Sequence, residues 1–383
     1  MVSENCIVYS FHFSMLPVNV NEGKVYIMEL KIELTTAPKE LPNQDALGFG
    51  RIFTDHMFEM DYEEGKGWHN ARIVPHHDFN LNPANATLHY GQAIFEGLKA
   101  YRTPDNRITL FRPTENMKRL NNSARILCVP EFDEEFVLDC LKKLVAIDER
   151  WIPSKPGTSL YIRPYIFSTD PYLGVSVGKQ YKMAIILSPV AAYYAAGFAP
   201  VRIKVEDKYV RAVIGGTGEA KTAANYAASL HGDYVAHQEG FAQTLWLDVI
   251  ERKYVEEVGS MNIVFKINGE IITPELTGSI LPGITRKSVL EVVRSWGMKA
   301  TERRITIEEV FEAAKNGTLE EAFGTGTAAV ISPVGELCWK GESIIINGGK
   351  TGETAQKLYD TITGIQTARL EDPFGWVIEV PKA

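Results

Sequence analysis

The chain has 383 residues, of which 45% are hydrophobic and 23% are charged, and its formal net charge is -8. This composition is that of an ordinary globular protein, and a chain of this length more often divides into two domains than folds around one core. The acidic balance gives no positive field for a phosphate backbone, so we expect small-molecule substrates and no nucleic-acid partner. No apolar run approaches the roughly 20 residues of a membrane helix, so we expect no membrane partner.

The first 190 residues predict an α+β domain preceded by a leader. Residues 1–27 contain an apolar run without a partner pattern, and we expect this segment to be poorly ordered. Residues 28–190 form the smaller domain, in which strand-like runs are interrupted by helical patterns. The predicted strands cover residues 107–112, 159–170 and 181–190. One helix is expected from Pro113 to about Leu127, and the apolar face of a second consists of Phe136, Cys140, Leu141, Leu144 and Val145.

The second half predicts a larger mixed α/β domain. Residues 191–200 are mostly small, with glycine and proline, and are expected to connect the domains, so that the second domain spans residues 201–383. An Asn268-Gly269 pair between two apolar runs predicts a β-hairpin, because these residues tolerate the positive φ angles of a two-residue turn. Two helices have recognisable ends. The first is expected to be capped by Thr285 and to end at Gly297, and the second to have a capping box, Thr306 with Glu309, and to end at Gly317.

Four short segments of this second half contain residues that could bind a ligand or take part in catalysis. Glycines before Lys221 let backbone approach a ligand closely, and a partly desolvated lysine can act as a nucleophilic amine. Glu257 at a strand end is a carboxylate that could keep a pyridine nitrogen protonated. Residues 281–286 (L-P-G-I-T-R) open a helix, whose free N–H groups suit a phosphate, and residues 323–329 (F-G-T-G-T-A-A) add small residues and hydroxyls. Taken alone, each segment is more often an ordinary turn, strand end or helix start than part of a ligand site.

Cysteine usage points to a reducing compartment. The four cysteines form neither a C-x-x-C pair nor a zinc-type spacing, so we expect no metal site and a cytoplasmic location. They are Cys6, Cys128, Cys140 and Cys338.

Taken together and in this order, the four segments resemble the fold-type IV pyridoxal-phosphate aminotransferases, and among them the branched-chain subgroup. The motifs G-G-x-G-x-x-K, E-V-G-x-M-N, L-P-G-I-T-R and F-G-x-G-T-A carry the resemblance, together with F-E-G-x-K-A-Y and L-Y-I-R-P upstream, and it covers roughly residues 30 to 380. It implies a two-domain fold like that of D-amino-acid aminotransferase, classed as α/β and α+β, with pyridoxal 5'-phosphate held between the domains.

The resemblance also implies roles for individual residues. Lys221 corresponds to the Schiff-base lysine, Glu257 to the partner of the pyridine nitrogen, and Tyr226 to the donor to the phenolic oxygen. The remaining cofactor residues it implies are Arg119, Arg211, Leu281, Gly283, Ile284, Thr285, Gly326 and Thr327, with Arg119 and, less directly, Arg211 near the phosphate. The substrate residues it implies are Phe49, Tyr90, Phe95, Tyr161, Arg163, Ser260 and Ala328, and strand alternation makes Arg163 our candidate for the side-chain carboxylate of glutamate.

The reaction implied is reversible amino transfer between leucine, isoleucine or valine and 2-oxoglutarate, by a homodimer. Within the same fold, a D-amino-acid aminotransferase or an aminodeoxychorismate-type lyase is the alternative. A protein that only binds a phosphate ligand is a third possibility, but it would not need Lys221. The best branched-chain substrate and the physiological direction stay open.

Overall fold

The computed structural model describes residues 18–21, 24–26, 28–191 and 198–382. Contacts divide the chain into unit 1, Met1–Ala191 with Ile378–Ala383, and unit 2, Ala192–Val377. The sequence pattern assigned the last residues to the second domain, whereas in the structure they join unit 1, because Val380 N–H donates to Ile108 O at 2.9 Å. Most of the expected leader and residues 192–197 of the expected connection lie outside the described residues. Where the leader is described, two short strands pair antiparallel, β1 (Val18–Asn21) and β2 (Lys24–Tyr26).

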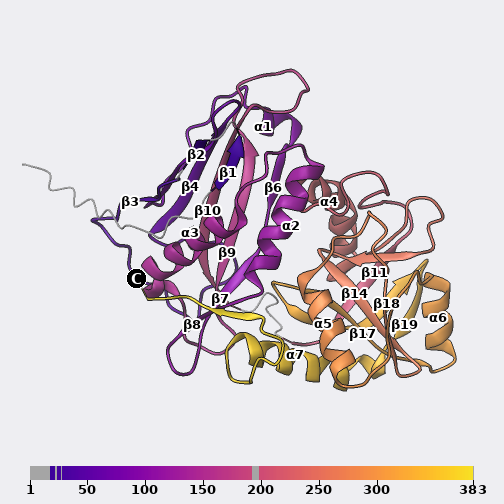
Figure 1. The fold of residues 1–383 in the computed structure, drawn as a ribbon. Coiled ribbons are helices and arrows are strands. Elements are labelled where there is room, and N and C mark those ends of the chain that lie inside the picture. The colour runs from indigo at the N-terminus through magenta and orange to yellow at the C-terminus, as the bar shows by residue number, and fades with distance from the viewer. Residues whose placement is uncertain (1–17, 22–23, 27, 192–197, 383) are drawn as a thin grey trace, which may run out of the picture. The chain divides into compact units, whose positions relative to one another are not determined.

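Unit 1 is built on a large sheet (Figure 1). Along its main path the strand order is β20-β8-β7-β9-β10-β4-β5-β3, and β6 pairs with β9 beside that path. The strands are β3 (Lys31–Ile32), β4 (His56–Glu63), β5 (Gly67–Pro75), β6 (Ala93–Phe95), β7 (Leu98–Arg102), β8 (Ile108–Phe111), β9 (Ser159–Ser168), β10 (Gln180–Val190) and β20 (Val377–Glu379). Where the register is recorded, neighbours are antiparallel except β3 and β5.

The described residues of unit 1 also form three α-helices, of which the second and third pack on this sheet and form its core with it. They are α1 (Ala86–Tyr90), α2 (Pro113–Ile126) and α3 (Glu134–Ile147), followed by a 3₁₀ turn at Glu149–Trp151. The two expected helices are confirmed: α2 begins at Pro113, which suits a first helical position, and Asp133 caps α3 by accepting the Phe136 N–H at 2.9 Å. The predicted face of α3 is buried, except for Phe136, which is partly buried. These faces pack with β4, β9 and β10 into one apolar cluster.

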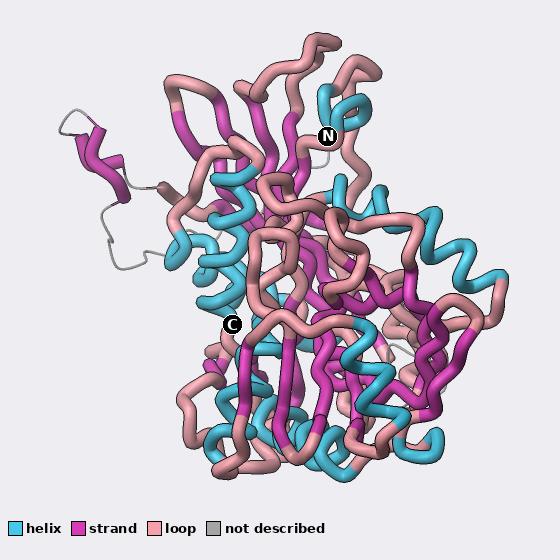
Figure 2. Tube along the Cα trace, turned by 90° about the vertical axis from the view of Figure 1, so that its right-hand side faces the viewer, coloured by secondary structure: helices cyan, strands magenta, loops and turns pink. Residues whose placement is uncertain are grey.

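Unit 2 contains a closed ring of strands, each with the next as neighbour: β13-β12-β11-β18-β17-β14, with β13 pairing back to β14. Ring closure leaves no free edge among these strands, and their apolar side chains fill the interior. The ring strands are β11 (Val201–Glu206), β12 (Gln243–Leu247), β13 (Val255–Val258), β14 (Met261–Ile267), β17 (Leu319–Gly326) and β18 (Val330–Trp339). Outside the ring lie β15 (Glu270–Thr273), β16 (Ala300–Glu302) and β19 (Glu342–Ile345). Figure 2 shows the chain by secondary structure, with helices in cyan, strands in magenta and the loops that join them in pink.

The helices of unit 2 test the local predictions. They are α4 (Ala223–Gln238), α5 (Ile284–Ser295), α6 (Ile307–Lys315) and α7 (Glu353–Gln366), with a 3₁₀ turn at Asn347–Gly349. The hairpin is confirmed, with φ of 50° at Asn268 and 74° at Gly269. Thr306 caps α6 as expected, but the Glu309 side chain binds Arg303. The cap at Thr285 was wrong: α5 begins at Ile284, after Gly283. Within the described residues, no helix is long and apolar enough to cross a membrane.

Candidate active site

Lys221 lies at the end of the glycine loop, directly before α4, and faces Tyr226. Its Nζ is 2.7 Å from the Tyr226 hydroxyl. Tyr226 lies in the first turn of α4, five residues after Lys221 along the chain. The loop is closed by Asn225, whose Nδ2 donates to Thr217 O at 2.7 Å and to Ala220 O at 2.8 Å. The lysine amine is therefore half-buried at a fixed position beside a phenol.

Glu257 is a buried carboxylate, 2% exposed, on β13. One oxygen accepts the Leu281 N–H at 2.6 Å and the Asn262 amide at 3.3 Å, and the other lies 3.0 Å from Arg211 Nε. A carboxylate that has both a guanidinium and N–H donors is stabilised in its charged form. The arrangement therefore offers a fixed negative charge inside unit 2.

Arg211 connects two of the sequence motifs, the glycine loop and the E-V-G segment, with Ser279. Besides Glu257, its guanidinium donates to Ser279 O at 2.9 Å and to Gly218 O at 3.4 Å. Gly218 must lack a side chain here, because a Cβ would lie 2.4 Å from Ser279 O. The sequence resemblance placed Arg211 near a phosphate, and its contact with Glu257 was not anticipated. No local signal reveals that contact, which depends on the long-range folding of the loop onto β13.

The neighbouring carboxylate, Glu256, is also buried but has a different environment. Burial raises the pKa of this carboxyl above its usual range, although a hydrogen bond from Ser279 Oγ, at 2.5 Å, opposes the shift. Adjacent strand residues point to opposite faces, so the two glutamates cannot substitute for one another. Of the two, it is Glu257 that forms the ion pair with Arg211.

The start of α5 provides backbone N–H groups. Ile284 and Thr285 are both buried and lie in its first turn, where N–H groups have no partner within the helix. The first intrahelical bond runs from Lys287 N–H to Gly283 O at 3.0 Å. A Cβ on Gly283 would lie 1.9 Å from Asn262 Oδ1, so this glycine is required by the close approach of Asn262. Asn262 also donates to Leu281 O at 2.9 Å and was missed by the sequence analysis, although it belongs to the E-V-G-S-M-N segment.

The remaining unit 2 candidates lie in two turns. Gly326 ends β17, and Thr327 and Ala328 follow in the turn to β18, all half-buried. Ser260 is exposed in the tight turn between β13 and β14. Thr325 was not singled out from the sequence, yet its buried hydroxyl has no hydrogen-bond partner among the described residues. Such a hydroxyl has donor and acceptor capacity left for a ligand.

In unit 1 the structure brings together Phe49, Phe95, Tyr161 and Arg163. Tyr161 and Arg163 share one face of β9, and Arg163 Nη2 donates to the Tyr161 hydroxyl at 3.0 Å. The guanidinium carbon of Arg163 lies 4.6 Å from the Phe95 ring centroid, and Phe49 meets Tyr161 edge-on at 5.1 Å. The buried Arg163 Nε has no hydrogen-bond partner within the described part of the chain. This aromatic group therefore holds a cation whose hydrogen-bonding capacity is only partly used.

Gly97, directly before β7, and Lys99, on β7, both lie next to Tyr161 of this group. A Cβ on Gly97 would lie 2.1 Å from the Tyr161 hydroxyl, so Gly97 makes room for that ring. Lys99 pairs in register with Tyr161 across β7 and β9, and burial lowers its pKa to about 8. Neither role was recognised from the sequence, because each depends on the pairing of two distant strands.

Arg119 and Tyr90 have other partners. Arg119 lies on α2 in unit 1, where its Nε and Nη2 donate to both oxygens of the buried Glu96 at 2.7 and 3.0 Å. Tyr90 ends α1, is 44% exposed and donates its hydroxyl hydrogen to Leu173 O. Glu96 belongs to the F-E-G segment but was given no role, since a lone glutamate carries no spacing signal.

Comparison with known proteins gives a consistent result. A family described as amino-transferase class IV matches residues 93–337. The chain is 60% identical to branched-chain-amino-acid aminotransferase 2 of Bacillus subtilis strain 168, over 92% of this chain and 97% of that protein. A crystal structure of the Escherichia coli branched-chain amino acid aminotransferase has a TM-score of 0.71 at 26% identity, covering 85% of this chain and 99% of the other. The branched-chain aminotransferase of the archaeon Thermoproteus uzoniensis, solved with norvaline, has a TM-score of 0.71 at 26% identity, with 85% and 100% coverage.

Proposed function

The chain belongs to the branched-chain-amino-acid aminotransferases of class IV, and from this premise we propose that it exchanges amino groups between leucine, isoleucine or valine and 2-oxoglutarate. The fold is that of the fold-type IV enzymes, as the solved structures of this family show. High identity to curated branched-chain enzymes over nearly the whole chain favours this activity over the D-amino-acid aminotransferase and the lyase.

The cofactor we propose is pyridoxal 5'-phosphate, and the residues of unit 2 fit it. Lys221 offers the amine, Glu257 a carboxylate for the ring nitrogen, and Tyr226 a phenol for the ring oxygen. The start of α5, with Ile284, Thr285 and the hydroxyl of Thr327, suits a phosphate. Leu281, Gly283 and Gly326 would line the same place, and the buried Thr325 hydroxyl with its unused hydrogen-bonding capacity supports the fit. When bound, this cofactor supplies an electron sink for carbanion chemistry.

Lys221 is the residue we propose to move the proton of the reaction. Its Nζ is held 2.7 Å from Tyr226 Oη, which can stabilise the amine in a position to take the substrate's Cα proton. Glu257 stays anionic beside Arg211 and holds a proton at the ring nitrogen. We propose that Arg211 fixes this carboxylate and does not contact the phosphate, and that Arg119 reaches the phosphate while Glu96 orients it.

The aromatic group of unit 1 is the proposed side-chain recognition site. Phe49, Phe95 and Tyr161 present apolar surface, and each buried methylene of a branched side chain is worth about 0.8 kcal/mol. Arg163 would meet the side-chain carboxylate of glutamate, which needs a charge-assisted partner in an apolar setting. Tyr90, Ser260 and Ala328 complete the proposed set of substrate residues.

A homodimer is the assembly we propose. The surface around α1 and residues 172–177 exposes several large apolar side chains, and Tyr90 ties the two segments together through Leu173 O. Such a gathering of apolar side chains is typical of an interaction surface. Its members are Leu88, Tyr90, Tyr172, Leu173, Val175 and Val177. We also propose a cytoplasmic location, in keeping with the free thiols of the three described cysteines.

The single observation that carries the proposal is that unit 2 contains both the Lys221–Tyr226 contact and the buried Glu257, which accepts the Leu281 N–H just before α5. The test is to purify the protein, record its visible spectrum, and add L-leucine and then 2-oxoglutarate. We expect the cofactor's absorbance to change with leucine and to return with 2-oxoglutarate, with one 2-oxo acid formed per amino group. A response to D-alanine and none to L-leucine would contradict the proposal.

A further inference from the structure

The loop that carries Phe49 is held together at its two ends. Residues 40–54 lie between β3 and β4 and contain neither a helix nor a strand. Lys39 and Asp55 border the loop, and the Lys39 N–H donates to Asp55 Oδ1 at 2.8 Å. Long loops without secondary structure are usually functional, and a loop whose ends meet can form a compact unit on the surface. The contact between its ends therefore sets the shape of this loop.

Asp55 is at the centre of that contact. It is 4% exposed, and its Oδ2 accepts from Arg150 Nη2 at 2.7 Å and from Trp151 Nε1 at 2.8 Å. Burial raises the pKa of Asp55, but hydrogen bonds from the Lys39 N–H, Trp151 and Arg150 outweigh it and hold the pKa below its usual range. Arg150 Nη2 also donates to Lys39 O at 2.6 Å, and Lys39 Nζ donates to Thr54 O at 2.8 Å. These contacts among Lys39, Thr54, Asp55 and Arg150 form the loop closure.

His56, the first residue of β4, fixes the chain on its way to the loop. The Thr35 N–H donates to His56 Nε2 at 2.9 Å, so that nitrogen is an acceptor and the ring hydrogen is on Nδ1. Nδ1 lies 2.7 Å from Asp148 Oδ1, and Asp148 Oδ2 accepts the His56 N–H at 3.0 Å. The neighbours Asp55 and His56 therefore hold the incoming chain at two points, Lys39 and Thr35.

The far part of the loop places Phe49 against Tyr161. Gly48 O accepts the Ala191 N–H at 3.0 Å, which docks the backbone beside the end of β10. Gly48 and Gly50 have φ of 62° and 69°, a region that favours glycine, so the chain turns on both sides of Phe49. The Phe49 ring then meets Tyr161 edge-on at 5.1 Å. Its position depends on the backbone of the loop, which the loop closure holds.

We propose that Asp55 is a positioning residue for the substrate site, because its carboxylate maintains the loop closure and thereby holds the Phe49 ring against Tyr161. This rests on the proposed function, in which both rings bind the side chain of the substrate. Asp55 acts through the backbone of the loop and takes no part in the chemistry. A displacement of about 1 Å in a substrate-positioning group can cost roughly 100-fold in rate, so the loop closure has weight in catalysis.

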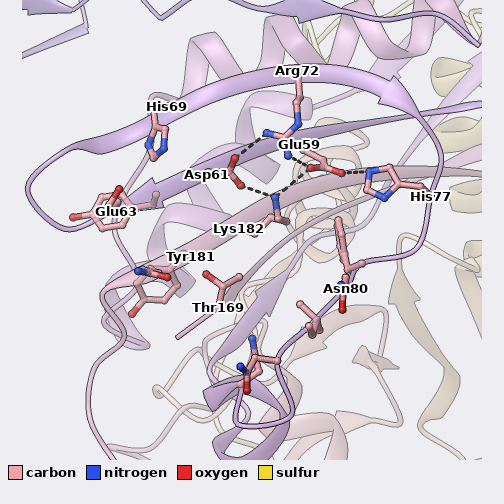
Figure 3. Close-up of a pocket in the computed structure, with 16 residues that line it drawn as sticks. Glu59, Asp61, Glu63, His69, Arg72, His77, Asn80, Thr169, Tyr181 and Lys182 are labelled. Atoms are coloured by element: carbon pink, nitrogen blue, oxygen red, sulfur yellow. Dashed lines mark hydrogen bonds and ion pairs between the residues drawn. The ribbon is translucent and has the colours of Figure 1, made fainter. Parts of the chain in front are cut away.

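The other end of β4 provides a matched control. Asp61 accepts from Arg72 at 2.8 Å and from Lys182 at 2.5 Å, and with Glu59 these residues form an ionic quartet beside a cavity of about 520 Å³ (Figure 3). As at Asp55, burial raises the pKa of Asp61, and hydrogen bonds outweigh it and hold the pKa below its usual range. Its partners lie on β5 and β10, so Asp61→Asn removes a comparable charge from the same strand and leaves the loop closure in place.

Amide hydrogen exchange of the holoenzyme measures the loop closure without any substrate. Asp55→Asn puts an amide NH₂ where Arg150 and Trp151 donate, or where the Lys39 N–H does. We expect the Thr54 and Ala191 amides, whose hydrogen bonds join the loop to the end of β10, to exchange at least about tenfold faster in this variant. Unchanged exchange at these two amides would overturn the proposal.

Lys39→Met is the milder variant, and it decides the matter if Asp55→Asn folds poorly. It removes an exposed amine that donates to Thr54 O and keeps the Lys39 N–H. Exchange at the same amides should rise, by a smaller factor than in Asp55→Asn. In Asp61→Asn these amides should exchange as in the wild type. An equal rise in Asp61→Asn, or none in Lys39→Met, would contradict a specific role of the loop closure.

A double-mutant cycle with Phe49→Ala shows whether Asp55 acts through that ring. Asp55→Asn should lower kcat/KM for L-leucine about tenfold. On the Phe49→Ala background it should change kcat/KM by less than about twofold, because the ring that the loop positions is gone. Asp61→Asn should leave kcat/KM within about twofold in either background. A double variant that loses the product of the two single losses would overturn the positioning role. A holoenzyme without activity on leucine would contradict the proposed function, whereas the exchange rates would still decide whether Asp55 holds the loop.

Discussion

The two groups of candidate residues differ in how firmly their charges are held. In unit 2, Glu257 forms an ion pair with Arg211 and accepts hydrogen bonds from two further N–H donors. The Arg211 guanidinium also donates to two backbone carbonyls. In unit 1, Arg163 has a single hydrogen-bond partner among the described residues, the Tyr161 hydroxyl, and lies against aromatic rings. Chemistry at a fixed ring requires charges at fixed positions. A site that accepts both apolar and acidic side chains needs a charge that pairs with the acidic one and makes no contact with the apolar one. The small number of hydrogen bonds to Arg163 suits this proposed role.

The largest effect is expected at Lys221, whose Nζ is the proposed reactive atom of unit 2. Lys221→Ala removes the amine that contacts Tyr226, so turnover should fall at least roughly 1,000-fold. The cofactor could still bind through its phosphate. Stopped-flow half-reactions and the visible spectrum measure this. Lys253→Ala, which removes a partly exposed lysine of the same unit, is the control and should behave like wild type. Normal turnover of the Lys221 variant would remove it from the mechanism.

Arg211→Met tests whether the rigidity of unit 2 depends on one guanidinium. It leaves Glu257 buried without its cation, which should cost about 3–5 kcal/mol of unfolding free energy. Chemical denaturation of the apoenzyme measures this. Arg202→Met removes an exposed arginine that pairs with Glu336 through the same Nε geometry, at 2.7 Å, and should cost less than about 1 kcal/mol. Similar losses in both variants would show that the buried pair has no special weight.

Glu257→Gln should lower the rate of the chemical step by about 100-fold, because the fixed charge at the ring nitrogen is lost. Cofactor binding should change less, since Gln still accepts the Leu281 N–H. The control is Glu256→Gln, a buried neighbour that binds Ser279. Single-turnover kinetics distinguish the two carboxylates. If both variants slow the step equally, the effect is one of folding and not of the ring nitrogen.

Lys99 sharpens the comparison because it is a buried lysine of unit 1. Its pKa is lowered by burial to about 8 from an ordinary 10.5, so the unfolded chain binds the proton more tightly than the folded one. Stability is therefore reduced below pH 8 and recovers as the pH rises toward 10.5. Relative to Lys99→Met, the wild type should gain about 2 kcal/mol of unfolding free energy between pH 8 and 10. A flat difference across this range would contradict the burial of a charged amine.

Local patterns predicted local structure well. Helices α2, α3 and α6 and the turn at Asn268-Gly269 follow from periodicity, caps and turn residues, which act over a few neighbouring positions. The start of α5 was misplaced by local rules, because Asn262, distant in sequence, excludes a side chain at Gly283 and fixes the chain there.

Long-range pairs were beyond the sequence patterns. The contact of Arg211 with Glu257 and that of Arg119 with Glu96 depend on which strand or loop lies beside which. The same holds for the quartet of Glu59, Asp61, Arg72 and Lys182, which exists only because β4 pairs with β5 and β10 in one register. Family resemblance named many single residues, but not the partners that hold them.

Arg163 has the smallest and most selective expected effect. Arg163→Gln keeps a polar side chain beside Tyr161 but removes the charge. Leucine makes no use of that charge, so its half-reaction should stay within about twofold of wild type. Glutamate and 2-oxoglutarate lose a charge-assisted partner, worth about 1.5 kcal/mol more than a neutral one, so their kcat/KM should fall about tenfold.

The alternative is that Arg163 only braces the aromatic group of unit 1, through its contacts with Phe95 and Tyr161. A brace predicts equal losses for leucine and glutamate together with a lower melting temperature, because removing the cation would loosen both rings. Arg150→Gln supplies the reference for that outcome, since Arg150 also lies against an aromatic ring, 5.3 Å from the centroid of Trp151, and pairs with the buried Asp55. A structural loss should look alike in the two variants. A loss confined to the acidic substrates and to Arg163→Gln would mean that the loosely held charge of unit 1 selects substrates, as the contrast with the rigid charges of unit 2 predicts.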